Sequence, residues 1–201
     1  FPLEYHSSKL MEKYIGKPFS EGFKTRMDRE ELKSAIKWLN DHFSFLMPVE
    51  NDLTISAILE LAKTLVYRRG MRSLVIDPWN EVDHSRPNGM TETEYISQSL
   101  TKIRRFARTN NCHVFVVAHP FKMVKLDGKN YPCPTPYDIS GSAHWRNKAD
   151  NCLAVWRDVS PENQTFEIEI HVQKIRKKHI GKLGMVKLEY EYSTGRYQDI
   201  S

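Results

Sequence analysis

The stretch Ser73-Leu-Val-Ile-Asp77-Pro78 decides the fold of this chain. Three consecutive aliphatic residues followed by a carboxylate are typical of a buried strand in a parallel sheet, with a functional residue where the strand ends. In phosphate-binding α/β proteins an aspartate at this place holds Mg²⁺, directly or through water. The loop G-x-x-x-x-G-K-[ST], which would bind the phosphates, occurs nowhere in the sequence, and Gly16-Lys17-Pro18 is the nearest string. Asp77 therefore has another task, or the chain is part of a nucleotide-binding domain that begins upstream of residue 1.

Helix-like and strand-like patterns alternate through the first two thirds of the chain. Apolar periodicity and capping residues predict helices, of which the main ones are 9–15, 28–39, 54–69 and 91–109. Short apolar runs predict strands ending near residue 5 and covering 43–47, 73–77 and 113–118. The last third is strand-rich, with strands predicted at 153–156, 166–172 and 185–190. This order predicts an α/β fold with a mainly parallel sheet flanked by helices, and antiparallel strands at one edge.

Length and composition fit one ordinary globular domain. The 201 residues are enough for a full core, and 27% of them are charged. No apolar run approaches the roughly 18 residues of a membrane span. The three cysteines lack metal-ligand spacing, which favours a reduced environment over a disulfide framework. The net charge of +5 permits nucleic-acid binding without requiring it.

Chemically active residue types stand at the ends of the predicted strands. They are Glu4, Asp77, His119 and the pair Lys174 and Arg176. In a parallel sheet, ligands bind where the strands end. Phosphoryl transfer requires a carboxylate for the metal, a carboxylate that orients water, a polar sensor of the γ-phosphate, and cations that stabilise developing charge. This set of residues contains one candidate for each task.

The order of these motifs resembles the C-terminal RecA-like motor of DnaB-like replicative helicases, in the Twinkle and phage primase-helicase branch. The motifs that carry the resemblance are Phe1-Pro-Leu-Glu4-Tyr5, Leu74-Val-Ile-Asp77, Val116-Val-Ala-His119-Pro120, Ser140-Gly-Ser142 with Ala149-Asp150, and Lys174-x-Arg176. The resemblance spans residues 1–199 and implies a RecA-like P-loop NTPase core. The departure is the missing Walker A strand and loop, which we expect upstream of Phe1, so that residues 1–201 form a motor domain truncated at its N-terminus.

The resemblance implies a role for each candidate. Glu4 would polarise the attacking water, Asp77 would be the Walker B aspartate beside Mg²⁺, and His119 would sense the γ-phosphate. Arg176, with Lys174 beside it, would be an arginine finger that reaches the nucleotide of a neighbouring subunit. The adenine would lie between Arg157 and Tyr190. The loops after His119 and around 140–148 would line a central channel, where the DNA contacts are Lys122, Lys125, Lys129, Arg146 and Lys148.

The implied function is an ATP-driven DNA helicase motor. It would act as a homo-oligomeric ring, hexameric in this family, that uses ATP and Mg²⁺ to translocate on single-stranded DNA. A primase-like domain or partner would accompany it, in a bacterial or phage cytoplasm or in a mitochondrion. Two alternatives stay open: a RecA-like module that binds DNA or assembles without hydrolysis, and a recombinase-type ATPase that forms filaments. Trp145 lies inside the predicted channel segment, where it is either a packing residue or a platform for a base.

Overall fold

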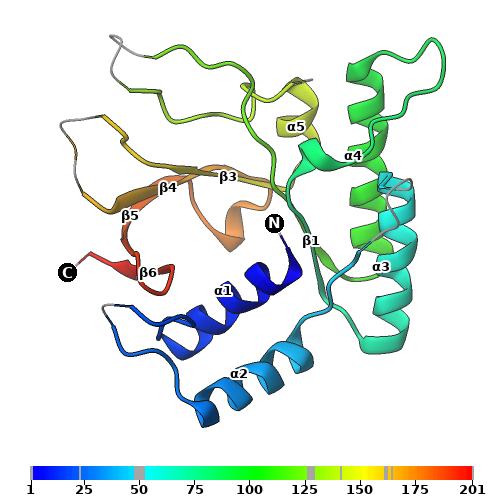
Figure 1. The fold of residues 1–201 in the computed structure, drawn as a ribbon. Coiled ribbons are helices and arrows are strands. Elements are labelled where there is room, and N and C mark those ends of the chain that lie inside the picture. Colours follow the sequence, from blue (N-terminus) through cyan, green and yellow to red (C-terminus); the bar gives the residue numbers. More distant parts are fainter. Residues whose placement is uncertain are drawn as a thin grey trace. The chain divides into compact units, whose positions relative to one another are not determined.

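The computed structural model describes residues 2–22, 24–47, 53–125, 130–140, 142–160, 163 and 165–200. The chain divides into two compact units. Figure 1 shows its helices and strands with their labels. The first unit contains Phe1–Phe45, Arg157–Ile170 and Val186–Ser201. The second unit contains Leu46–Trp156 and His171–Met185. Within the described residues, no helix is long and apolar enough to cross a membrane.

The second unit is built on a parallel pair of strands, β1 (Ser73–Ile76) and β2 (His113–Val116). Their register pairs Ser73 with His113 and Ile76 with Val116. Helix α3 (Ile55–Arg69) precedes β1, and helix α4 (Glu92–Thr109) connects β1 to β2. Both helices contribute to one apolar core that includes the inward side chains of β1 and β2. The strands and helices predicted for this region are confirmed.

Local sequence explains where these helices begin and end. The Thr54 hydroxyl accepts a hydrogen bond from the Ala57 amide at the start of α3, and Gly70 ends that helix in the left-handed conformation. Thr91 and Glu94 form a reciprocal capping box at the start of α4. These side chains satisfy backbone groups that a helix end leaves without partners.

The two faces of the parallel pair differ. Leu74 and Ile76 are buried against α3 and α4, whereas Val75 between them is 60% exposed. On β2, Phe115 is 48% exposed while its neighbours Val114 and Val116 pack against the core. Alternation along each strand therefore leaves one apolar face of the pair uncovered by described residues of this unit.

A helix that the sequence analysis did not predict occupies part of the expected channel loop. This helix, α5 (Ser142–Lys148), comes after β2 in chain order, and a short 3-10 turn, η1 (Trp79–Glu81), follows β1. Trp145 fixes α5 to the core: it is 7% exposed, meets the ring of Trp79 edge-on at 5.1 Å, and donates from Nε1 to the Ser140 carbonyl at 2.8 Å. A helix of two turns gives almost no periodic signal, so the tertiary contact of Trp145 decides its structure. Trp145 is a packing residue.

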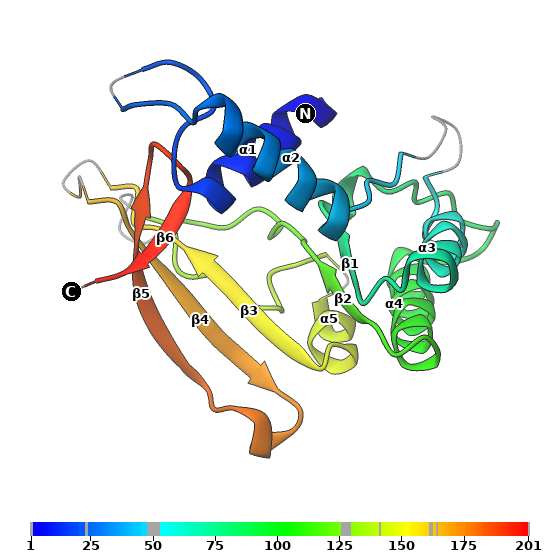
Figure 2. The same ribbon diagram turned by 90° about the horizontal axis from the view of Figure 1, so that it is seen from below.

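The last third of the chain forms a four-stranded sheet in the order β3-β4-β5-β6 (Figure 2). Its strands are β3 (Asn151–Trp156), β4 (Glu167–Ile175), β5 (Gly184–Glu191) and β6 (Arg196–Asp199), and a 3-10 turn η2 (Lys178–Ile180) lies between β4 and β5. Strands β5 and β6 are antiparallel. The sequence analysis predicted β3, β4 and β5 and missed β6, which has only four residues. Parallel and antiparallel strands together with helices confirm the α/β class.

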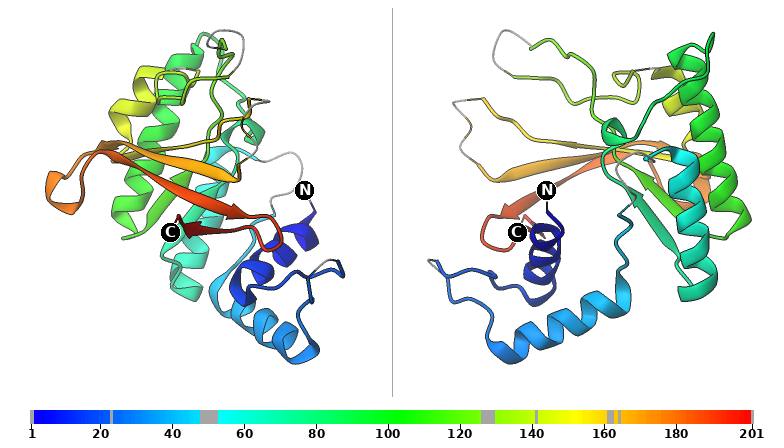
Figure 3. Two further views of the ribbon diagram at one scale, coloured as in Figure 1. Left: turned by 90° about the vertical axis from the view of Figure 1, so that its left-hand side faces the viewer. Right: turned by 45° about the vertical axis from the view of Figure 1, so that its right-hand side comes forward.

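In the first unit, α1 (Leu3–Ile15) and α2 (Arg29–His42) pack through the small core of Met11, Met27, Ala35 and Leu39. The capping box that was predicted from Asp28-x-x-Glu31 is present. Arg196 of β6 donates to the carbonyls of Lys13 and Tyr14 at the end of α1. The β5–β6 hairpin is thus joined to α1 within this unit, and the two lie close together in the ribbon (Figure 3).

Two strand predictions in the first unit are wrong. Residues 3–5 belong to α1 rather than to a strand end, because Pro2 begins the helix and Glu4 lies in its first turn, where a negative charge is favourable. Residues 43–47 form no strand. Phe43 instead ends α2 and packs against Trp38, with ring centroids 5.2 Å apart. An apolar run becomes a strand only where a neighbouring strand pairs with it.

Candidate active site

The parallel pair carries Asp77 and His119 toward the same edge. Asp77 follows the last residue of β1, and His119 lies three residues after the end of β2. Backbone pairing continues past the strand ends, since the Val117 amide donates to Ile76 at 2.9 Å and the Trp79 amide donates to Val117 at 2.7 Å. The two segments therefore leave the sheet side by side, as expected of a ligand-binding edge in an α/β sheet.

Both side chains at this edge are exposed. No described residue hydrogen-bonds the Asp77 carboxylate or the His119 ring. A solvent-facing carboxylate without a protein partner fits a metal ion held through water, because Mg²⁺ usually keeps several waters and takes one or two carboxylates. Within the described ranges, no group of three or more His, Cys, Asp or Glu side chains could hold a metal by itself. Asp77 could therefore supply only part of the coordination of a metal ion.

Lys174 and Arg176 lie beside the end of α5. Lys174 is the penultimate residue of β4, and its Nζ donates to the carbonyls of Arg146, Asn147 and Ala149. Arg176 follows β4 directly, and its Nη2 donates to the Asn147 carbonyl at 2.8 Å. The last carbonyls of a helix lack partners within it, so cations are favourable there. Burial and the neighbouring Arg176 charge lower the pKa of Lys174 below its usual value.

Asp150 completes this cluster in the second unit. Its Oδ1 lies 2.5 Å from Nε of Arg176 and 3.3 Å from Nη2 of Arg104 on α4. Its backbone carbonyl also accepts from the Arg176 amide at 2.8 Å. Asp150 therefore joins the end of β4 to α4, directly after the end of α5.

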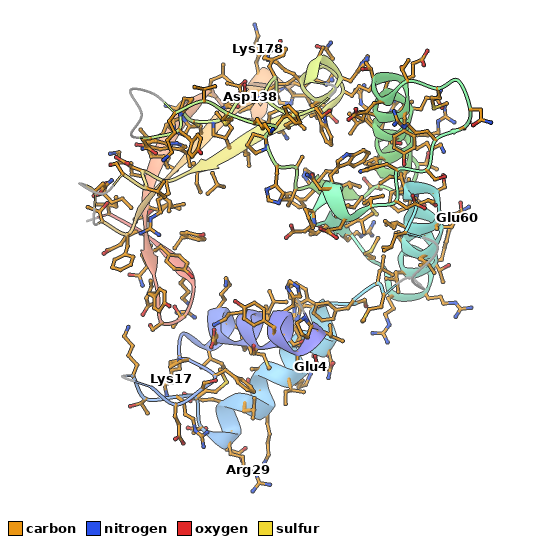
Figure 4. All side chains as sticks on the ribbon, turned by 45° about the horizontal axis from the view of Figure 1, so that its top comes forward. Glu4, Lys17, Arg29, Glu60, Asp138 and Lys178 are labelled. Atoms are coloured by element: carbon orange, nitrogen blue, oxygen red, sulfur yellow. The ribbon has the colours of Figure 1, made fainter. Side chains whose placement is uncertain are left out.

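Glu4 belongs to the first unit. It is exposed in the first turn of α1 (Figure 4), so the prediction that it follows a strand is corrected. Its predicted role in orienting water stays a prediction.

Arg157 and Tyr190, also in the first unit, are both neighbours of Phe166. The Arg157 guanidinium is 5.6 Å from the centroid of the Phe166 ring, and its Nη2 donates to Thr165 at 3.1 Å. The Tyr190 amide donates to the Phe166 carbonyl at 2.9 Å, and its ring is 5.3 Å from that of Tyr197. The predicted adenine site thus contains an additional exposed ring, Phe166, which the sequence analysis did not select.

The segment 121–140 carries the predicted DNA lysines. Lys122 and Lys125 are exposed, and the Lys125 ammonium is 5.4 Å from the Tyr131 ring centroid, whereas Lys129 lies outside the described residues. An open pocket of about 510 Å³ is lined by residues from both ends of the segment, among them Phe121, Lys122, Tyr137 and Asp138. Hydrogen bonds anchor the segment to the sheet, among them Gln173 to Pro134 at 2.7 Å.

Arg146 and Lys148, the other two predicted DNA contacts, lie on α5 and are partly buried. Arg146 lies 5.5 Å from the Tyr137 ring centroid. Lys148 donates to the Thr101 hydroxyl on α4. Both side chains therefore have partners in their own unit, and the partner of Arg146, Tyr137, lines the open pocket.

Sequence reasoning missed the contacts of Asp150 with Arg176 and with Arg104. Asp150 appeared only as part of the Ala149-Asp150 motif. A signal was present, because a carboxylate directly after a short basic segment and before a strand is a natural partner for cations at strand ends. Nothing in the sequence pairs it with Arg176, which is 26 positions away.

Known structures define the class of fold. The chain is similar to a solved ATPase domain, with a TM-score of 0.77 and 18% identity over 100% of this chain and 72% of that one. It is also similar to a DnaB-like replicative helicase studied with its primase (TM-score 0.76, 17% identity, 100% and 50% covered) and to the RadB recombinase (0.57, 14%, 98% and 73%). The chain therefore has the fold of RecA-like ATPase domains.

The particular family follows from the sequence. The model of the DnaB-like helicase C-terminal domain matches residues 4–199, and the chain belongs to this family. The chain is 44% identical over 200 residues to the Twinkle homolog protein, chloroplastic/mitochondrial, of Arabidopsis thaliana. That match covers 96% of this chain and 28% of that protein, so the chain spans little more than a quarter of its curated relative.

Proposed function

We propose that this chain is most of the motor domain of an ATP-driven DNA helicase that works as a ring. The observation that carries the proposal is the shared edge of β1 and β2, where Asp77 and His119 emerge side by side. Membership of the DnaB-like family supports it.

The residues of this chain would divide the work. Asp77 would help to hold Mg²⁺, and a bound ion would supply positive charge beside the nucleotide phosphates. Glu4 orients the attacking water and accepts its proton. His119 donates a hydrogen bond to the γ-phosphate. Because segment 121–140 begins two residues later, binding of this phosphate would affect the position of the segment. Arg176 supplies a planar, permanently charged fork to the nucleotide of the neighbouring subunit.

The phosphate loop itself would come from sequence upstream of residue 1. Among the described residues, β1 and β2 pair only with each other, which leaves backbone groups open along the outer edges of the pair. We infer that an upstream strand pairs along one of these edges and leads into the glycine-rich loop. This chain alone would then bind Mg-ATP weakly or not at all, because the loop's amides and lysine are absent from it.

The partners of the proposed motor are single-stranded DNA and further copies of the same chain. Lys122, Lys125, Lys129 and Arg146 would contact DNA phosphates in the channel of a hexameric ring. A primase-like domain or partner would accompany the motor, as primase interacts with the solved DnaB-like helicase. The relative's name supports an organellar location over the bacterial or phage cytoplasm, and a fluorescent fusion of the full-length protein would test it.

The filament-forming alternative rests on one observation, the weaker likeness to the RadB recombinase. Electron microscopy of the full-length protein with ATP and single-stranded DNA separates the alternatives. Closed rings support the proposal, whereas continuous filaments favour the recombinase-type reading. A non-catalytic module would give neither turnover nor nucleotide-dependent assembly.

Hydrolysis by the full-length protein tests the site. We expect Glu4→Gln to keep ATP binding, since the phosphate loop and Asp77 provide it, and to lower turnover about 10²–10⁴-fold through loss of a proton acceptor. Calorimetry and steady-state kinetics measure the two quantities. Glu21→Gln, another exposed carboxylate of the first unit, is the control. Equal loss of binding and turnover in Glu4→Gln would give Glu4 a structural role.

The salt dependence of DNA binding tests the loop. We expect Lys122→Ala with Lys125→Ala to weaken binding to single strands of any sequence and to reduce the slope of log K against log salt by about 0.7 per lost phosphate contact. Fluorescence anisotropy at several salt concentrations measures this slope. Lys33→Ala with Lys37→Ala removes two exposed charges from α2 as a control. An unchanged slope in the loop variant would remove segment 121–140 from the DNA path.

A further inference from the structure

The Arg176 side chain makes several contacts within its own unit, although its proposed role lies at a neighbouring subunit. Its Nε contacts Asp150 Oδ1 at 2.5 Å, and its Nη2 donates to the carbonyls of Asn147 and Ala149 at 2.8 and 3.2 Å. Its backbone amide also donates to Asp150. One edge of the guanidinium is therefore bound within its own unit.

The opposite edge of the guanidinium remains available. An arginine has five N–H donors in a fixed plane, and those on Nε and Nη2 face Asp150 and the end of α5. No described residue accepts from Nη1, and the Arg176 side chain is 36% exposed. Because the plane is rigid, binding one edge fixes the direction in which the Nη1 donors point.

We propose that Asp150 is a positioning residue that, with the last carbonyls of α5, holds the Arg176 guanidinium so that Nη1 is presented to a nucleotide phosphate of a neighbouring subunit. This inference rests on the proposed function, in which Arg176 is the finger. Asp150 touches neither nucleotide nor metal and acts only through Arg176.

The same contacts connect the finger to the predicted DNA segment. Helix α5 ends at Lys148, beside Lys174 and Arg176, and begins two residues after Ser140 at the end of segment 121–140. Arg104 reaches Asp150 Oδ1 from α4, so the carboxylate is held from a second side. A displacement of α5 by DNA would therefore move the partners of Arg176 with it.

The competing reading is that Asp150 only stabilises the end of α5. Lys174 already binds three carbonyls there, so the end of α5 stays satisfied without the carboxylate. Asp150 and Arg176 are both substantially exposed, and a pair of that kind contributes little to stability. If Asp150 had a purely structural role, its replacement would change kcat only slightly, and by the same factor whether or not Arg176 is present.

The test uses the full-length protein and four variants: Asp150→Asn, Asp150→Glu, Arg176→Ala and the double variant Asp150→Asn with Arg176→Ala. We expect Asp150→Asn to lower kcat for DNA-stimulated hydrolysis about 10²-fold while KM for ATP stays within about two-fold, because misplacement affects the transition state. Asp150→Glu should restore part of the rate. In the Arg176→Ala background, Asp150→Asn should have no further effect. Asp41→Asn is the control, since Asp41 is 51% exposed, Asp150 is 54% exposed, and both are paired with a cation.

A second readout does not depend on activity. A dicarbonyl reagent modifies accessible guanidinium groups, and peptide mass spectrometry gives the rate at Arg176. We expect Asp150→Asn to accelerate this modification, and an unchanged rate would overturn the proposal, as would additive effects of the two substitutions on kcat. A third outcome separates the two proposals: Asp150→Asn accelerates modification of Arg176, but Arg176→Ala hydrolyses ATP at the wild-type rate. Asp150 then still holds the guanidinium, whereas the role of Arg176 as an arginine finger is refuted, and with it this part of the proposed function.

Discussion

At the scale of single residues, the carboxylate of Glu191 is surrounded by hydrogen-bond donors that lower its pKa. The Lys24 ammonium lies 2.6 Å from its Oε1, and the Thr194 and Ser193 hydroxyls donate to it at 2.7 and 3.0 Å. These hydrogen bonds, that of Lys24 foremost, lower the pKa of Glu191 to about 2. All four residues belong to the first unit, where they close the turn between β5 and β6.

This pKa predicts how stability changes with pH. Because the folded pKa lies below the ordinary glutamate value, the charged form stabilises the fold fully above about pH 4.5, and this stabilisation is lost as pH falls toward 2. We expect wild type to exceed Glu191→Gln in free energy of unfolding by a constant amount at neutral pH, and by a shrinking amount below pH 4.5. Urea unfolding at several pH values measures the difference. Glu189→Gln, an exposed neighbour on β5, is the control variant. A pH-independent difference for Glu191→Gln would refute the charge-based account.

At the scale of secondary-structure elements, α5 depends on a single anchor. Trp145 is the one side chain of this helix in the buried core cluster of the described residues. A helix of seven residues is unstable by itself in water, so its structure follows from this contact and from the cations at its end.

Replacement of that anchor should destabilise the second unit. We expect Trp145→Ala to cost about 3–5 kcal/mol in free energy of unfolding, through the cavity it leaves. Trp145→Phe should cost less, since it keeps most of the ring contact with Trp79 and loses the hydrogen bond to Ser140, worth about 1 kcal/mol. Chemical denaturation of both variants measures the two values. A cost below about 1 kcal/mol for Trp145→Ala would mean that neighbouring side chains move into the cavity.

Sequence predicted the elements whose signal is local. Thr54, Gly70 and the Asp28-x-x-Glu31 box mark helix ends through bonds to residues a few positions away, and the structure contains them all. Helix α5 was missed because contacts distant in sequence decide it, and the strand predicted at 43–47 is wrong because no described strand pairs with that run. The edge with Asp77 and His119 was predictable, since parallel strands end together. The partners of Arg176 could not be predicted, because their distance from its guanidinium depends on how β4 and α5 pack.

At the scale of the whole molecule, the proposed ring requires residues from two subunits at each site. Full-length Arg176→Ala protein should bind ATP and lose about three to five orders of magnitude in hydrolysis. Mixing it with Glu4→Gln protein should restore part of the activity, because some interfaces then combine an intact Glu4 with an intact Arg176 of the neighbour. ATPase assays across mixing ratios measure the recovery. No recovery, with subunit exchange confirmed by fluorescence transfer, would place Arg176 in its own subunit's site or in structure alone.

The uncovered face of β1 and β2 affects how this chain behaves in solution. Val75 and Phe115 project from it, and adjacent open strand edges offer unpaired amides and carbonyls. Apolar surface beside an open edge favours sheet-to-sheet aggregation. Self-association of residues 1–201 alone could therefore arise from aggregation through this exposed face. It would be evidence neither for nor against assembly into a ring. Solubility screening should begin with polar substitutions at Val75 and Phe115, before any size measurement is interpreted.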